Sequence, residues 1–402
     1  MSARKIVAFS LIATALFFVG CWFATPFDGF CPRLADGLNV CDYRFFIRKC
    51  LVEYEPYRPV NILPRDACYP PIAYCLVKCF PLTSCGEAFY VAFLFLGLLA
   101  GFVFFLWQRE RRQVLLCLGA VVMTVPFASG PIRGNPSAWA AGALFVHLAW
   151  YDAEAVWKRM VAATALGFAA SLKVTPVIYG LLYLRGCLFS PEKWPKLEIS
   201  VAAMSFLVLF AVPFVSFGGP NEVDVLIGNA LANSKHYGQL ADFGFVPVAR
   251  LLGLIRSPMA LTLAMQLTSA FVLLFCFAAC FTRRSYLSLT LLGVAMVFLC
   301  HHEYGLAYLL PAFASWLGEK WPDAKQVCGN RWVAIVEAAL WFLVFEQAMC
   351  VKSVYSVYYC GVICNWAVIA LGLLSFALVA VSWLREKANI GVFRFFESGA
   401  EA

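Results

Sequence analysis

Long apolar stretches separated by short polar gaps make up most of the chain. Breaking this pattern at charged residues and at proline and glycine gives about twelve segments of helix-spanning length. These segments cover residues 5–25, 87–107, 113–129, 135–151, 160–172, 175–187, 198–217, 259–281, 286–301, 303–318, 332–350 and 361–383. The pattern predicts an all-α polytopic membrane protein with about twelve transmembrane helices. Two of the ranges, 160–172 and 175–187, are short for a span of about 20 residues, which leaves open two half-length helices that meet at a break.

The composition excludes an ordinary soluble protein. Of the 402 residues, 62% are hydrophobic and 13% are charged, whereas about 25% are charged in a typical soluble domain. A soluble domain needs a polar shell that this chain lacks, and a lipid bilayer removes that need. The apolar segment 5–25 is longer than the core of a signal peptide, roughly 7–15 residues, so we expect an uncleaved first helix. Because the sequence shows no internal repeat and no separate polar domain, we expect residues 1–402 to form one membrane-embedded domain.

Charge placement predicts the orientation in the membrane. The net charge is +8, and the basic residues lie mainly in alternate gaps between the apolar segments. This arrangement is typical of cytoplasmic loops and does not indicate a nucleic-acid partner. The basic gaps contain Arg4, Lys5, Arg109, Arg111, Arg112, Lys158, Arg159, Arg185, Lys193, Lys196, Arg283, Arg284, Lys320, Lys325, Arg331, Arg385, Lys387 and Arg394. We therefore expect a multi-pass protein of the inner (plasma) membrane with both termini in the cytoplasm, including a tail over 384–402.

Two long hydrophilic segments, 26–86 and 218–258, then fall on the opposite, non-cytoplasmic face. Within them, residues 43–57 and 246–255 show a pattern typical of amphipathic helices that lie in the membrane interface. The first segment also carries seven of the 17 cysteines, namely Cys31, Cys41, Cys50, Cys68, Cys75, Cys79 and Cys85. These cysteines lack zinc-ligand spacing. Either these cysteines form disulfides in an oxidising compartment, or they are small buried residues with free thiols.

Polar groups crowded at one face of a membrane protein are energetically costly, so each cluster is a candidate for function. Asp42, just beyond the first apolar segment, suits a general base for a hydroxyl group, although the local sequence favours a helix cap. Tyr69 precedes Pro70 and Pro71, which form a rigid entry into the next segment. The tyrosine is a candidate for stacking on a sugar ring, and a simple turn is the alternative.

Two further clusters lie at corners between apolar segments. Asn135 and Ser137 are candidate helix caps at the first corner, and Arg133 beside them is a candidate phosphate ligand. At the second corner, Lys173 precedes Pro176, whose ring breaks the helix and places the ammonium at the outer surface. It is either a snorkelling lysine or a fixed cation for an anionic head group. Later loops add weaker candidates on the same face, namely Asn233, Lys235, His236, His302 and Glu303.

The order of these motifs resembles glycosyltransferase family 87, part of the GT-C superfamily. The resemblance is carried by Asp42-Tyr43, Tyr69-Pro70-Pro71, Gly134-Asn135-Pro136-Ser137, Ala169-Ala170-Ser171-Leu172-Lys173-Val174-Thr175-Pro176, Asn233-Ser234, and Leu309-Leu310-Pro311 after His302-Glu303. It implies a GT-C-like enzyme that moves a sugar, with mannose as first choice, from a polyprenyl-phosphate donor to a glycolipid or glycan acceptor. The scheme requires no metal and no other cofactor.

The resemblance also implies roles for the candidate residues. Single displacement with inversion needs one base for the acceptor hydroxyl, and Asp42 takes that role. The departing phosphate needs cations, for which the candidates are Lys173, Arg133, Lys235 and His236. The candidates for substrate binding are Tyr43, Tyr69, Asn135, Asn233, His302 and Glu303.

Two other classes of membrane protein compete with this interpretation. A transporter or flippase for a lipid-linked substrate predicts internal repeats and charges near the middle of the membrane, and neither feature is found. A lipid-linked glycan polymerase or ligase is expected to carry essential Arg and His residues in a large late outer loop. Here the larger outer segment comes first, which favours the glycosyltransferase.

Overall fold

The structure, a computed structural model, describes residues 69–80, 84–109, 130–131, 134–189, 195–217, 223–229, 243–254, 257–282, 284–300, 303–320, 331–346 and 356–399. Every regular element within these residues is an α-helix or a short 3-10 helix, so the predicted all-α class is confirmed for them. The predicted ranges 5–25 and 113–129 lie outside the described residues, and every other predicted range overlaps a helix.

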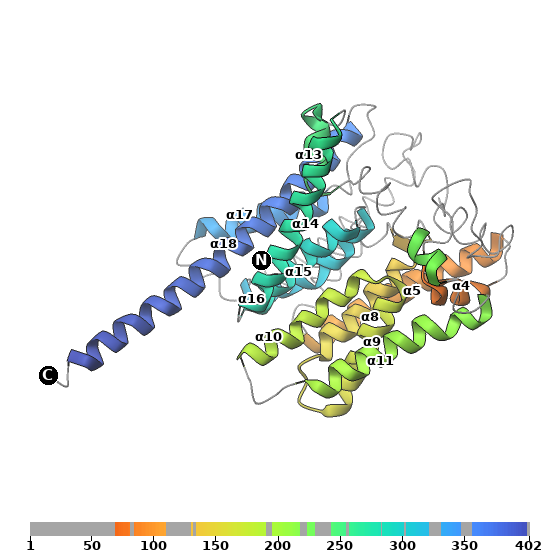
Figure 1. The fold of residues 1–402 in the computed structure, drawn as a ribbon, viewed down its shortest axis with the longest axis horizontal. Helices are drawn as coiled ribbons and strands as arrows, with labels where there is room; N and C mark the ends of the chain where they lie inside the picture. The colour runs from red at the N-terminus through yellow and green to blue at the C-terminus, as the bar shows by residue number, and fades with distance from the viewer. Residues whose placement is uncertain are drawn as a thin grey trace, which may run out of the picture.

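The helices lie side by side in two groups (Figure 1). The first group contains α4 (Pro71–Lys78), α5 (Ser84–Arg109), α8 (Ser137–Trp150), α9 (Val156–Leu172), η4 (Thr175–Gly180), α10 (Leu181–Phe189), α11 (Lys196–Ala211) and η5 (Val212–Phe217). The second contains α13 (Phe245–Leu251), α14 (Pro258–Cys280), α15 (Ser285–Cys300), η7 (Glu303–Leu309), α16 (Leu310–Lys320), α17 (Arg331–Glu346) and α18 (Ser356–Gly399). The C-terminal part of α18 stands clear of both groups and covers the predicted tail as far as Gly399.

Four described helices are long and apolar enough to cross a bilayer, namely Phe89–Arg109, Lys196–Val215, Pro258–Cys280 and Ile363–Leu384. Shorter apolar helices lie beside them, among them Ser137–Trp150 and Ser285–Cys300. Large apolar side chains on the outside of α11 and α14, such as Met204 and Leu273, are exposed. An exposed apolar surface of this kind matches lipid, so the chain is a membrane protein.

The helix expected over 246–255 is shorter than predicted. Helix α13 ends at Leu251, and Gly253 follows it with a φ of 70°. Val246 and Ala249 face α14 and are buried, whereas Leu251 and Leu252 are exposed. The other expected interfacial helix, over 43–57, lies outside the described residues.

Small residues let α5 and α8 approach closely. A Cβ atom built on Gly101 would lie 2.2 Å from the backbone oxygen of Gly142, and one on Gly142 would lie 2.5 Å from that of Gly97. A side chain at either position would collide with the facing backbone, so the two backbones are in contact along this crossing. Glycines at such crossings are typical of helix packing in membranes, where close contact replaces the hydrophobic effect.

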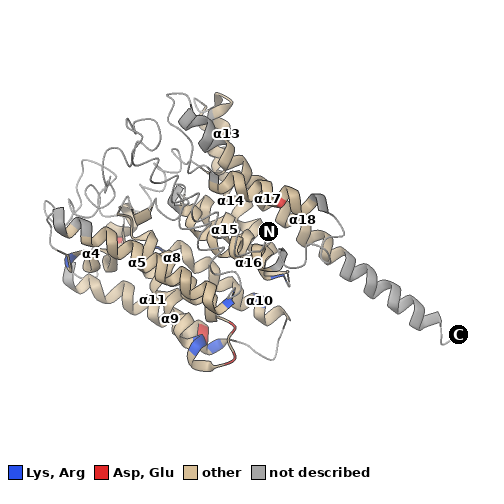
Figure 2. Ribbon diagram, turned by 180° about the vertical axis from the view of Figure 1, so that it is seen from behind, with Lys and Arg blue, Asp and Glu red and all other residues tan. Residues whose placement is uncertain are grey.

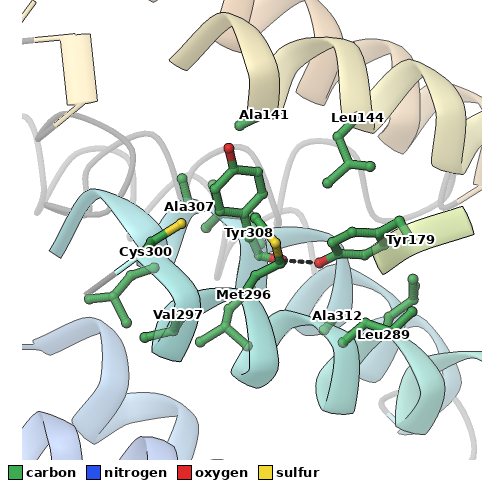
Figure 3. Close-up of a cluster of buried hydrophobic side chains, with 14 of the residues drawn as sticks. Ala141, Leu144, Tyr179, Leu289, Met296, Val297, Cys300, Ala307, Tyr308 and Ala312 are labelled. Carbon is green, nitrogen blue, oxygen red and sulfur yellow. Dashed lines mark hydrogen bonds between the residues drawn. The ribbon is translucent and has the colours of Figure 1, made fainter. Parts of the chain in front are cut away.

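Helix α15 forms the centre of the second group and also joins the two groups. Nearly all of its side chains are buried. Figure 3 shows Tyr179 of η4 reaching over α15 toward Tyr308 of η7. The Tyr179 hydroxyl donates a hydrogen bond to the Tyr308 carbonyl at 3.1 Å, and both tyrosines are fully buried. This bond links residues 129 positions apart and helps to fix the first group against the second.

We expect Gly142→Val to lower the unfolding temperature of the purified protein in detergent. Added side-chain atoms at this crossing would force the two backbones apart, and overpacking of this kind costs about 1–3 kcal/mol. Gly186→Val in α10 is the matched control, because a Cβ there meets nothing within 4 Å. Thermal unfolding of both variants measures the difference, and equal unfolding temperatures would contradict the close crossing.

Candidate functional site

Polar side chains from three separate segments meet in one hydrogen-bonded chain at one end of the first helix group. The Lys173 ammonium donates to the Ser137 hydroxyl oxygen at 3.1 Å. The Ser137 hydroxyl donates to the Asn135 side-chain oxygen at 2.6 Å. The Asn135 side-chain nitrogen donates to the Tyr69 hydroxyl oxygen at 3.0 Å. We call these four residues the polar chain.

Two prolines place Tyr69 at its end of the polar chain. Pro70 has an extended backbone (φ −58°, ψ 152°), and Pro71 begins α4 at a position where a missing N–H costs nothing. The Tyr69 ring is partly buried and packs against the main apolar core. The rigid entry predicted from Tyr-Pro-Pro is therefore confirmed, and it leads into an eight-residue helix.

A tight backbone corner holds Asn135 and Ser137. Gly134 has a φ of 70°, a left-handed conformation that glycine adopts without strain. Its carbonyl oxygen accepts a hydrogen bond from the Tyr90 hydroxyl at 3.3 Å. The Asn135 side-chain oxygen also accepts from the backbone N–H of Ser137 at 2.9 Å, which satisfies a donor in the first turn of α8. Asn135 and Ser137 are 1% and 3% exposed, so this corner is a buried polar site.

A break between two helices places Lys173. Helix α9 ends at Leu172, Lys173 is extended (φ −154°, ψ 119°), and η4 begins at Thr175 with Pro176 in its first turn. The break predicted between 160–172 and 175–187 is thus confirmed. Because Lys173 leaves the helix axis here, its ammonium reaches Ser137 on the neighbouring helix α8.

Two ion pairs between described side chains lie at the other end of the same helices, where Figure 2 shows blue and red side by side. Arg159 donates to Glu198 at 2.6 Å, and Glu198 is buried. Arg109 pairs with Asp152 and also donates to the carbonyl oxygens of the last turn of α8. Since Arg159 and Lys173 are near opposite ends of α9, they lie roughly 20 Å apart along the helix axis. Among the described residues, these two ion pairs and the polar chain therefore lie at opposite ends of the bundle.

The glycosyltransferase family 87 model matches residues 67–302, which is more than half of the chain. The chain belongs to glycosyltransferase family 87. The matched region begins two residues before Tyr69 and contains the whole polar chain. Neither a curated protein nor a solved structure matches the chain. As a family 87 member, the protein is a membrane glycosyltransferase.

The structure of this family 87 protein brings together three of the residues singled out from the sequence, namely Tyr69, Asn135 and Lys173. It adds Ser137, which the sequence indicated only as a helix cap. The signal for Ser137 was its position two residues after Asn135, the spacing at which an Asn side chain accepts from a backbone N–H. The other candidates lie outside the described residues: Asp42, Tyr43, Arg133, Asn233, Lys235, His236 and His302. Glu303 begins η7, and its side chain is also outside the described part.

Candidate metal ligands and cysteines can be placed only for the described side chains of this family 87 protein. In the described ranges, no group of three or more His, Cys, Asp or Glu side chains is arranged to hold a metal ion. Cys75 and Cys79, in the segment 26–86, are free thiols one helical turn apart in and just after α4. The other five cysteines of that segment lie beyond the described side chains.

We expect Asn135→Ala to destabilise the family 87 protein. The substitution removes three hydrogen bonds at a buried corner and leaves the Ser137 N–H unsatisfied, a loss of about 1–3 kcal/mol. Thr290→Val is the control, because its buried hydroxyl bonds only within α15. Thermal unfolding in detergent measures both, and a smaller loss for Asn135→Ala than for Thr290→Val would contradict the corner's structural role.

Proposed function

We propose that this family 87 protein transfers a sugar, with mannose as first choice, from a polyprenyl-phosphate donor to a glycolipid or glycan acceptor. The observation that carries the proposal is the convergence of Tyr69, Asn135, Ser137 and Lys173 from distant parts of the sequence. A cation bonded to a hydroxyl that is itself held by an amide suits an anionic, hydroxyl-rich ligand such as a sugar phosphate.

In the proposed reaction, Lys173 stabilises the departing phosphate. The bond between the anomeric carbon and the phosphate oxygen breaks, and its electron pair remains on the phosphate. A cation held at that oxygen favours the transition state because negative charge develops there. The support for this role is that Ser137 orients the ammonium at a helix break. Further cations proposed for the phosphate are Arg133, Lys235 and His236.

Asp42 is the proposed base. It takes the proton of the acceptor hydroxyl as the hydroxyl oxygen attacks the anomeric carbon from the side opposite the phosphate. A single displacement of this kind inverts the configuration at the anomeric carbon. Tyr69 and Asn135 are proposed to contact the donor. The remaining residues proposed for substrate binding are Tyr43, Asn233, His302 and Glu303.

We further propose that the polar chain faces the non-cytoplasmic side of the plasma membrane. The opposite end of the bundle carries Arg109, Lys158 and Arg159, and basic residues in short loops favour the cytoplasm. Both termini are proposed to be cytoplasmic as well. A polyprenyl-linked donor suits this side, because the lipid keeps the activated sugar within the membrane where the site lies.

We expect Lys173→Met to reduce sugar transfer about 100- to 1,000-fold, the loss typical of removing a group that stabilises developing negative charge. Lys158→Met is the matched control: Lys158 lies over the rings of Trp150 and Trp157 at the other end of the bundle. Transfer from a polyprenyl-phosphate sugar by the purified variants measures the difference. Equal activity of the two folded variants would exclude Lys173 from the reaction.

Asp42→Asn is expected to reduce transfer about 100- to 10,000-fold while leaving donor binding intact, because the amide cannot take a proton. Asp224→Asn, an exposed carboxylate in the helical residues 223–229, is the control and should retain activity. Donor binding and turnover are measured on the same preparations. Near-normal turnover by a folded Asp42→Asn variant would remove Asp42 from the mechanism.

A further inference from the structure

The short 3-10 helix η4, which follows Lys173, has one side in the protein and another outside it. A 3-10 helix repeats every three residues, so Pro176 and Tyr179 share one side, and Val174 and Val177 share another. Pro176 and Tyr179 are buried, whereas Val174 and Val177 are 53% and 55% exposed. Burial therefore fixes the rotation of η4 about its own axis, with Tyr179 pointing into the protein.

The Tyr179 hydroxyl adds a directional contact to this burial. It donates to the Tyr308 carbonyl oxygen of η7 at 3.1 Å. A hydrogen bond of this kind is lost when the two atoms separate to about 3.6 Å, so it holds η4 against η7 to within about half an ångström. Because the internal hydrogen bonds of a 3-10 helix have poor geometry, contacts to neighbouring elements decide where such a helix lies.

The acceptor of this bond is held tightly by the second helix group. Helix η7 packs on α15 so closely that a Cβ atom built on Gly293 would lie 3.1 Å from the Tyr308 carbonyl oxygen. A Cβ atom built on Gly305 would lie 2.8 Å from the Cβ atom of Cys300. The residues from Gly305 to the end of η7 are all buried. The carbonyl that receives the Tyr179 hydroxyl therefore belongs to a closely packed support.

Tyr308 supports the segments that carry both Lys173 and Ser137. Its carbonyl holds η4, which begins two residues after Lys173. Its ring points toward Ala141 of α8, one helical turn after Ser137, and η7 contacts α8 (Figure 3). Lys173 and Ser137 are themselves bonded at 3.1 Å. The position of Lys173 relative to α8 therefore depends on the bond between Tyr179 and η7.

We propose that Tyr179 is a positioning residue for the proposed sugar transfer: its hydroxyl, bonded to η7, holds the Lys173 corner in place against α8. Tyr179 acts through the position of Lys173 and does not contact the substrate. The effect on activity rests on the proposed function, in which Lys173 stabilises the departing phosphate, whereas the coupling of η4 to η7 does not. The second helix group thereby supports a site whose polar side chains come from the first.

Amide hydrogen exchange of the full-length protein in detergent tests the coupling directly. Tyr179→Phe should speed exchange about 5- to 10-fold in peptides from both η4 and η7, the factor that corresponds to loss of one hydrogen bond from local stability. Tyr183→Phe is the matched control, because the buried Tyr183 hydroxyl has no hydrogen-bond partner among the described residues. This control should leave both peptides within about 2-fold of the native rate. Faster exchange in η4 alone, or in neither helix, would overturn the coupling.

Transfer activity tests whether the coupling positions Lys173. The donor is radiolabelled mannose on farnesyl phosphate, a short polyprenyl phosphate, and the acceptor is a lipid extract of the native membrane. Tyr179→Phe should lower transfer about 10-fold, because small displacements of a reacting group are costly. Tyr183→Phe should stay within about 2-fold of the native rate. In a Lys173→Met background, adding Tyr179→Phe should cost less than about 2-fold, since the group that it positions is gone.

The outcomes separate this inference from the proposed function. A loss of about 10-fold in both backgrounds would overturn the positioning role, because Tyr179 would then act on the fold and not through Lys173. Full activity of Tyr179→Phe would also overturn it and leave the proposed function standing. If Lys173→Met transfers as fast as the native protein, both the role of Lys173 and the positioning role fail. If the native protein transfers no mannose from this donor, the proposed function fails for that donor, and amide exchange alone decides the coupling of η4 to η7.

Discussion

The backbone N–H of Ser137, held by the side-chain oxygen of Asn135, is the contact on which the site depends. It satisfies a donor at the start of α8 that would otherwise be buried without a partner, which is energetically costly. It also orients the Asn135 amide, and through it the hydroxyls of Ser137 and Tyr69. The need to satisfy one N–H at the start of a helix therefore sets the direction of the hydrogen bonds made by the Asn135 amide. This explains how four residues from three segments are held in one hydrogen-bonded arrangement.

Described charged side chains at the two ends of the helix bundle bond to different kinds of group. At one end, Arg159 and Glu198 neutralise each other, which is the usual condition for a buried charge. At the other end, Lys173 bonds to a neutral hydroxyl. The close crossing of α5 and α8 holds this corner against the rest of the bundle, because Tyr90 on α5 bonds the carbonyl of Gly134.

Much of the fold follows from the sequence pattern, because a bilayer forces apolar stretches into helices. The break after Leu172 was also predictable, since Pro176 cannot continue a helix and the two flanking stretches are short. The pattern was less informative about the lengths of the helices. Several buried helices are shorter than a bilayer is thick, and α15 is apolar on all sides because protein surrounds it.

The site was predictable only in part. Local motifs pointed to Tyr69, Asn135 and Lys173, but bonds between positions 66 or 36 residues apart depend on helix packing, which no local pattern specifies. The sequence indicated Ser137 only as a helix cap, because its bond to Lys173 also depends on helix packing.

The central claim is that this family 87 protein binds a lipid-linked phosphate at the polar chain. The most direct measurement is an electron cryomicroscopy structure of the full-length protein in nanodiscs with farnesyl phosphate bound. The account predicts density for the phosphate within hydrogen-bonding distance of the Lys173 ammonium, at the end of the bundle that carries Asn135. Density for the phosphate at the opposite end, beside Arg109 or Arg159, would contradict it.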